Sequence, residues 1–88
     1  MKKINNFLDF PREIVSKVPK ITITAFDEVL IENFKRIIEY EEYFVKINTY
    51  IGIINIQGLN LVLSQMTEED IIVSGKIDSL EFEKGGNT

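Results

Sequence analysis

Residues 53–63 read Ile-Ile-Asn-Ile-Gln-Gly-Leu-Asn-Leu-Val-Leu, an alternation of apolar and polar side chains. Ile54 and Ile56 occupy even positions, whereas the three leucines that follow occupy odd ones. Because successive side chains of a β-strand point to opposite faces, both sets reach one core only if an extra residue is absorbed between them. The stretch therefore predicts strands with a bulge or sharp bend at Gly58, which tolerates a bend because it has no Cβ atom.

A related pattern lies closer to the C-terminus. The Ile-x-Ile-x-Gly of residues 54–58 recurs seventeen positions later as Ile-x-Val-x-Gly at residues 71–75. A β-solenoid would need three or more such units, so the interpretation we favour is two strands of a sandwich that share the same glycine-marked bend. The parity of the apolar residues changes again at Asp78-Ser79, which predicts a second kink there.

Most of the remaining chain favours strands. Fifteen isoleucines, together with valine, tyrosine and phenylalanine, give a β-branched and aromatic bias, and short polar or glycine breaks separate the apolar runs. The pattern predicts an all-β fold, a small antiparallel β-sandwich of about seven to eight short strands. The expected strands cover residues 20–25, 29–33, 36–40, 43–49, 53–57, 59–65, 71–75 and 77–83.

The chain is short enough for one domain. Residues 1–19 are expected to form an N-terminal arm with a short helix between Pro11 and Pro19, because proline suits the first turn of a helix and stops a helix further on. Residues 20–83 are expected to form the single β-sandwich domain. Residues 84–88 contain nothing to bury and are expected to be a disordered tail.

The composition argues against catalysis. Cysteine and histidine are both absent, which removes disulfides, Cys-ligated zinc and the commonest metal ligand and general base. No nucleotide-binding or hydrolase motif is present, and the acidic runs 41–42 and 68–70 fit solvated turns better than a metal site. We therefore predict no enzymatic activity, no cofactor and no metal. The longest apolar run, residues 50–54, is far shorter than the about 18 residues of a membrane helix, so no transmembrane segment is expected.

Four aromatic residues gather within a short stretch. Tyr40, Tyr43, Phe44 and Tyr50 are the candidate interaction surface, although core packing and cross-strand pairing also account for such residues. The alternative is a small ligand- or single-stranded nucleic-acid-binding β-barrel, in which aromatic side chains stack on bases. A net charge of −4, with Lys46 the one positive residue nearby, weighs against nucleic acid as a partner.

Several stretches form one ordered pattern from about residue 7 to residue 83. They are Leu8-Asp9-Phe10-Pro11, Pro19-Lys20-Ile21-Thr22, Ile31-Glu32-Asn33, Gly52-x-Ile54-x-Ile56-x-Gly58 and Ile71-x-Val73-x-Gly75-x-Ile77-x-x-Leu80-x-Phe82. In this pattern the chain resembles the YabP/YqfC family of sporulation proteins. The resemblance assigns structural roles at turns and bends to Pro11, Pro19, Gly52, Gly58 and Gly75, and it offers no catalytic residue.

The resemblance also implies a biological setting. It implies a protein of endospore-forming bacteria, made in the mother cell during sporulation, with no enzymatic activity known for the family. It implies a cytoplasmic location, peripheral at the forespore membrane, and a protein partner that is a membrane-bound sporulation protein. Strand edges also offer unpaired backbone groups for pairing with further copies, so a homo-oligomer is a further expectation.

Overall fold

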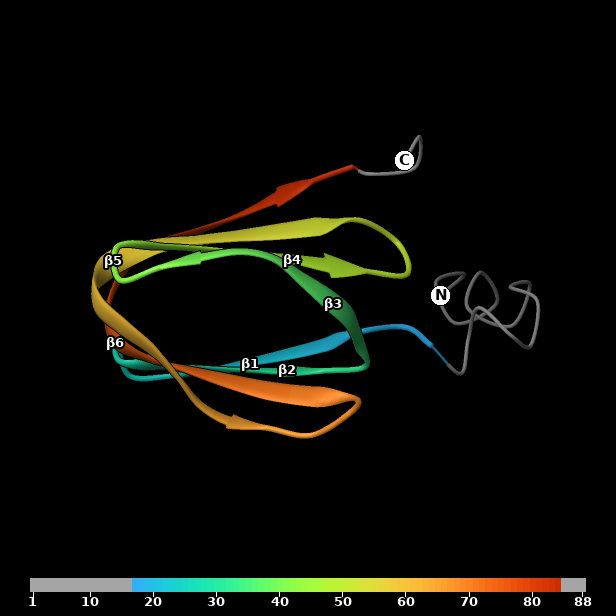
Figure 1. The fold of residues 1–88 in the computed structure, drawn as a ribbon, viewed down its shortest axis with the longest axis horizontal. Coiled ribbons are helices and arrows are strands. Elements are labelled where there is room, and N and C mark those ends of the chain that lie inside the picture. Colours follow the sequence, from blue (N-terminus) through green and yellow to red (C-terminus); the bar gives the residue numbers. More distant parts are fainter. Residues whose placement is uncertain (1–16, 85–88) are drawn as a thin grey trace, which may run out of the picture.

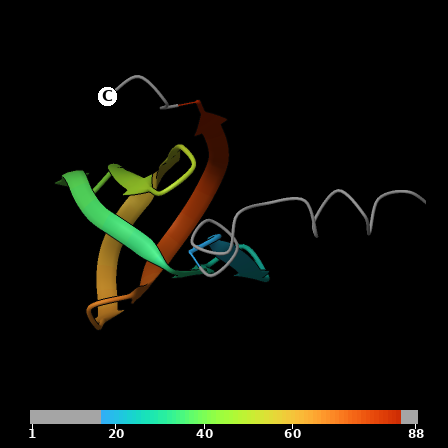
Figure 2. The same ribbon diagram turned by 90° about the vertical axis from the view of Figure 1, so that its right-hand side faces the viewer.

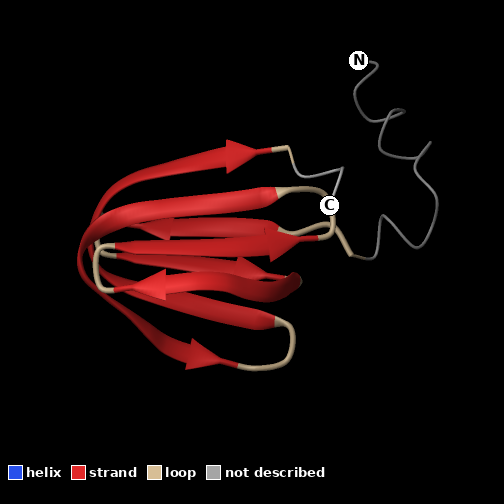
Figure 3. Cartoon of the chain, turned by 45° about the horizontal axis from the view of Figure 1, so that its top comes forward, coloured by secondary structure: helices blue, strands red, loops and turns tan. Residues whose placement is uncertain are grey.

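The computed structural model describes residues 17–84, which form six antiparallel strands in one sheet (Figure 1). The all-β fold class is therefore confirmed, and short turns connect the strands (Figure 3). The predicted N-terminal helix and the last four residues of the predicted tail lie outside the described residues. The strands are β1 (Lys20–Thr24), β2 (Glu28–Glu32), β3 (Phe34–Glu41), β4 (Phe44–Thr49), β5 (Ile53–Met66) and β6 (Asp70–Glu83).

Six strands replace the seven to eight that the sequence predicted. The expected strands 53–57 and 59–65 are one continuous strand, β5, and those at 71–75 and 77–83 are likewise one strand, β6. The expected breaks are bends within these strands. Bulges keep β5 and β6 hydrogen-bonded to each other through the bend, so the ladder turns a corner without ending.

The sheet folds over on itself into two layers. The strand order is β1-β2-β6-β5-β4-β3, with β1 and β3 at the two edges. In Figure 1 the upper layer contains β4, the first half of β5 and the end of β6, and the lower layer contains β1, β2 and the other halves of the long strands. Figure 2 shows β6 as one curved ribbon that runs through both layers. The packing is that of a sandwich built from a single bent sheet.

Two of the three irregularities in the β5–β6 ladder lie at the bend. One leaves Asp78 of β6 without a partner, at the place where the sequence predicted a kink. The other adds a residue to β5 beside Asn60, whose φ is 54°. The predicted change of parity in β5 therefore occurs at Asn60, not at Gly58. As a result Gly58 and Leu61 are buried, whereas Leu59, which the sequence placed on the core face, is exposed.

Two glycines allow the strands to approach each other at the bend. A Cβ atom at Gly58 would collide with the carbonyl oxygen of Lys76 and lie 3.0 Å from Cδ2 of Leu61. Gly75 has a φ of 135°, and a Cβ atom there would lie 2.6 Å from the carbonyl oxygen of Asn60. Any larger residue at either position would force the backbones apart.

The two hairpins, β1–β2 and β3–β4, brace the bend in the same way. The turn of each hairpin accepts two backbone hydrogen bonds from one long strand, β6 or β5 respectively. The four bonds are Gly75 N to Asp27 O (3.2 Å), Ile77 N to Phe26 O (2.9 Å), Gly58 N to Tyr43 O (3.1 Å) and Leu61 N to Glu42 O (2.7 Å). Gly58 and Gly75 therefore occupy equivalent positions, each bonded to the turn of one hairpin. This equivalence explains why the stretches that end at these glycines, residues 54–58 and 71–75, share one pattern.

The core lies between the two layers and consists mainly of β-branched side chains. Alternate residues of β2 and β4 supply it, and each fully buried aliphatic side chain contributes about 1.5–3 kcal/mol of transfer free energy. The buried apolar residues are Val29, Ile31, Phe34, Val45, Ile47, Ile54, Ile56, Leu61, Ile71 and Val73.

Candidate functional site

An apolar cavity of about 330 Å³ lies where the start of β1, the β4–β5 connection and the end of β6 meet. Ile21 of β1, Ile54 of β5 and Phe82 of β6 are among the residues that line it. Ile54 is buried, whereas the side chain of Phe82 is 72% exposed. Because the lining is dominated by aliphatic and aromatic side chains, the cavity favours an apolar group over a charged one.

In the other half of the sheet a phenylalanine occupies the equivalent place, beside a smaller and more polar opening of about 150 Å³. Phe34 at the start of β3 pairs with Thr49, is 7% exposed, and donates its backbone N–H to the carbonyl oxygen of Glu69 at 2.9 Å. Pro19, directly before β1, occupies the corresponding position in the β1–β2 hairpin and lines the cavity. Proline has a smaller side chain and no N–H to donate, so this end stays open.

A buried threonine shapes the β4–β5 connection beside the cavity. The side chain of Thr49 donates a hydrogen bond to the carbonyl oxygen of Gly52 at 2.7 Å. It also accepts bonds from the backbone N–H groups of Ile51 at 3.2 Å and Gly52 at 3.1 Å. The connection is therefore held in one conformation, with Ile51 59% exposed at the cavity.

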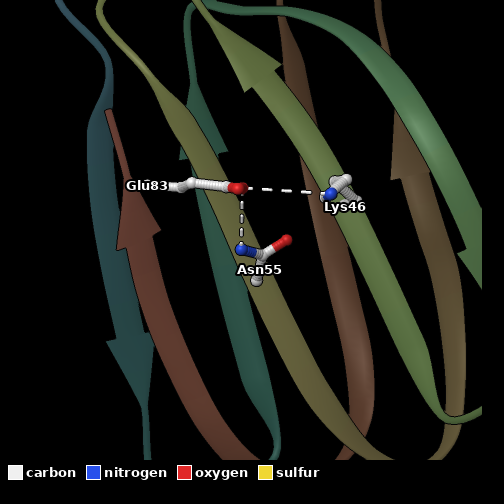
Figure 4. Close-up of polar contacts among 3 residues, drawn as sticks. All are labelled: Lys46, Asn55 and Glu83. Carbon is white, nitrogen blue, oxygen red and sulfur yellow. Dashed lines mark hydrogen bonds and ion pairs between the residues drawn. The ribbon is translucent and has the colours of Figure 1, made fainter. Parts of the chain in front are cut away.

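A small polar cluster lies across β4, β5 and β6 near the same end (Figure 4). Asn55 donates from Nδ2 to Oε1 of Glu83 at 3.2 Å, and Nζ of Lys46 lies 3.9 Å from the same oxygen. Oδ1 of Asn55 is buried and has no hydrogen-bond partner. Lys46, the positive charge closest in sequence to the aromatic residues, thus has an acidic neighbour.

The aromatic candidate surface is divided between two ends of β4. Tyr40, Tyr43 and Phe44 lie at the β3–β4 hairpin, and Tyr50 lies in the connection after β4. The hydroxyl group of Tyr40 donates to the carbonyl oxygen of Leu61 at 3.0 Å, so it fixes β3 to β5. Tyr43 and Phe44 line one hollow, whereas Tyr40 pairs with the buried Val45 and Tyr50 lies at the other end of β4.

Tyr50 has two cationic neighbours. Nζ of Lys17 lies 5.1 Å from the centre of the Tyr50 ring, and Nζ of Lys35 lies 5.4 Å from it. Both distances fall within the about 6 Å range of cation–π attraction, which contributes about 0.5–1 kcal/mol at exposed sites. These contacts connect the start of the described chain to β3 and the β4–β5 connection.

The second acidic run, residues 68–70, forms part of the turn between β5 and β6. The hydroxyl oxygen of Thr67 accepts hydrogen bonds from the backbone N–H groups of Glu69 and Asp70, at 3.2 Å and 3.0 Å. Oδ1 of Asp70 accepts the backbone N–H of Asn33 at 3.3 Å. Within residues 17–84, no group of three or more His, Cys, Asp or Glu side chains is arranged to hold a metal ion. In the same described range, no helix is long and apolar enough to cross a membrane.

The predicted turn residues occupy the following places. Gly52 lies in the β4–β5 connection, Gly58 and Gly75 lie at the bend, and Pro19 precedes β1. Pro11 lies outside the described residues.

The cavity itself was not predicted. Its lining comes from residues 19–21, 49–54 and 82–84, and no local pattern brings these segments together. One signal was present in the sequence. Phe82 continues the apolar alternation of β6 to the end of the strand, where it lies beside the cavity with most of its side chain exposed.

Comparison with known proteins places the chain in a family. A model of the YabP family matches residues 16–88, which include all six strands. The chain belongs to the YabP family. A relative of this YabP family protein in Bacillus subtilis (strain 168), named "Uncharacterized protein YqfC", is 27% identical over 75 residues. The matched region covers 85% of this chain and 81% of the relative. No solved structure matches the chain.

Proposed function

We propose that this YabP family protein acts in endospore formation without catalysing a reaction. It works by docking to a membrane-associated protein partner or by assembling with copies of itself. Its place is the mother-cell cytoplasm, peripheral at the forespore membrane. Membership of the YabP family supports this proposal, because it suggests a sporulation-related protein.

The composition supports a role in binding. The full chain contains neither histidine nor cysteine, the residues that most often serve as general base or thiolate nucleophile. Large apolar side chains at the open end and at the hairpin turns are exposed, among them Phe82 at 72% and Phe26 at 83%. Exposed side chains of this kind are typical of protein contacts.

Deletion of the gene in the spore former tests the role. We expect fewer heat-resistant spores and abnormal forespore morphology, with both restored by a wild-type copy at another locus. A Leu61→Ala copy, in which a core residue is truncated, controls for loss of the folded protein and should restore less. Normal yield, heat resistance and morphology in the deletion strain would refute the proposal.

A small apolar ligand is the second candidate function, and the cavity is the observation that favours it. Its volume of about 330 Å³ lies at the lower end of the about 300–1,000 Å³ typical of ligand sites. Thermal unfolding in the presence of straight-chain fatty acids of graded length tests this candidate. A concentration-dependent rise in melting temperature that Phe82→Glu abolishes would support it, and no rise at any length would refute it.

A further inference from the structure

The two edge strands of the sheet differ in how they are protected against pairing. The register of β3 with β4 shifts twice, between Phe34 and Arg36 and between Ile37 and Glu39, and most of the strand's outer positions are charged. Bulges and charges of this kind block the addition of another strand. By contrast, β1 pairs with β2 in continuous register, and Lys20 at its start is its one charged residue.

β1 also exposes apolar surface that belongs to the core face. Ile21 and Ile23 lie opposite Ile31 and Val29, and both of these partners are fully buried. Ile23 is nevertheless 55% exposed. Its side chain faces the interior but lacks a neighbour on the free side of β1, because no strand within residues 17–84 pairs with that side.

We propose that β1 pairs antiparallel with β1 of a second copy, around a two-fold axis at Thr22. This inference specifies the self-assembly named in the proposed function and rests on it for its biological role. The sequence of β1, Lys-Ile-Thr-Ile-Thr, is close to symmetric about its centre. In this register Thr22 faces Thr22 of the second copy, and Ile21 faces Ile23, so each copy supplies the missing apolar neighbour of the other.

The same pairing accounts for two further features, the exposure of Phe26 and the open apolar cavity. The pairing places the β1–β2 turn of one copy, which contains Phe26, beside the start of β1 of the other, next to Pro19 and the apolar cavity. Phe26 is 83% exposed in the single chain. By symmetry the contact forms twice, so the open end of each copy receives the turn of its neighbour.

The pairing is weak by itself. Stable interfaces use about 20–30 residues on each side, whereas β1 has five and the adjoining turn adds few. We therefore expect a concentration-dependent dimer in solution. Binding to a common partner or membrane surface would raise the effective concentration of the chains and strengthen the pairing.

Disulfide trapping tests the register, because the full chain contains no native cysteine. Directly opposed residues of an antiparallel pair have Cα atoms about 4.5–5.5 Å apart, within the range that a disulfide spans. Thr22→Cys is expected to form a covalent dimer on mild oxidation of the full chain. Lys20→Cys alone is the matched control, because its copies would lie about 13 Å apart at about 3.3 Å per residue. A mixture of Lys20→Cys with Thr24→Cys should give the mixed dimer.

Two results would refute the pairing of β1 with β1 of a second copy. If Thr22→Cys stays monomeric while its thermal unfolding matches the wild type, another occupant covers β1 or the edge stays free, and the pairing is wrong. Equal cross-linking of all three single variants would indicate random collision and would also refute it. These measurements use purified protein, so they are independent of the sporulation phenotype, which decides the proposed function.

A second variant tests the contact at the open end. Phe26→Asp should lower the cross-linking yield of Thr22→Cys at least several-fold, without lowering the melting temperature, because Phe26 is exposed. Tyr43→Asp, in the equivalent turn of the β3–β4 hairpin and 60% exposed, is the control and should leave the yield unchanged. An unchanged yield with Phe26→Asp would contradict the predicted contact between this turn and the open end of the second copy.

Discussion

Gly75 and Asn60 face each other across the bend of the β5–β6 pair, where a Cβ atom on Gly75 would lie 2.6 Å from the Asn60 carbonyl oxygen. Both residues have positive φ angles, 135° and 54°. Asparagine is one of the few residues that enter the left-handed region readily, whereas the φ of Gly75 strains any L-residue. The corner of the sheet therefore depends on a residue without a side chain packed against one that tolerates an unusual backbone.

Replacement of Gly75 by alanine should destabilise the fold strongly. The added methyl group meets the Asn60 backbone and the residue is forced into a strained φ, so we expect the free energy of unfolding to fall by about 3 kcal/mol or more. Gly52→Ala is the control, because φ of Gly52 is not positive, and it should cost less than about 1 kcal/mol. Urea denaturation of both variants measures the difference. Similar losses would contradict the account of the bend.

Two leucines separated by one position test the bulge at Asn60. Leu61 is 2% exposed and Leu59 is 51% exposed, although both have the same parity in the sequence. Leu61→Ala should lower the free energy of unfolding by about 2–5 kcal/mol. Leu59→Ala should lower it by less than about 1 kcal/mol. Similar losses for the two variants in denaturant unfolding would show that the parity changes at Gly58 after all, because both leucines would then face the core.

The hydroxyl group of Thr49 should contribute more to the stability of the fold than its methyl group does. Thr49→Val leaves the part-buried N–H groups of Ile51 and Gly52 without their acceptor, at a cost of about 1 kcal/mol. Thr49→Ser keeps the hydroxyl and should cost less than Thr49→Val. Thermal unfolding of the two variants gives the comparison. Equal stability of both would mean that the hydrogen bonds contribute nothing.

Two tyrosines near the β3–β4 turn should differ in their structural role. Tyr40→Phe removes the hydrogen bond to the Leu61 carbonyl oxygen and should lower the free energy of unfolding by about 0.5–1.5 kcal/mol. Tyr43→Phe, at an exposed turn position, should change it by less than about 0.5 kcal/mol. If the two losses are equal, the Tyr40 hydroxyl has no structural role and is available for a partner.

Much of the fold could be predicted from local pattern. Alternation of β-branched residues located all six strands, and the conflict of parity between Ile56 and Leu61 located the bend in β5. Local pattern could not show whether Leu59 or Leu61 is the first leucine after the bend to face the core. That choice depends on where the β3–β4 turn meets β5, since Glu42 accepts the Leu61 N–H from a distant part of the chain.

The candidate site was harder to predict, for the same reason. Tyr40 and Tyr50 belong to one aromatic cluster in the sequence, but β4 separates them because an extended strand moves about 3.3 Å per residue. Conversely, Ile21 and Phe82 are distant in sequence and meet at the cavity only because β1 starts on the side of the folded sheet where β6 ends. Strand order decides both outcomes, and no local pattern encodes it.

Because β5 and β6 each belong to both layers, the two layers share one central pair of strands. Separation of β1 and β2 from β6 leaves the long pair in place, whereas loss of the long pair removes the centre of both layers at once. The backbone amides of β5 and β6 on the two sides of the corner should therefore exchange with deuterium at one common, slow rate, and those of β1 should exchange first. The domain then has a single late-opening unit that spans its whole length, not two halves that melt in turn.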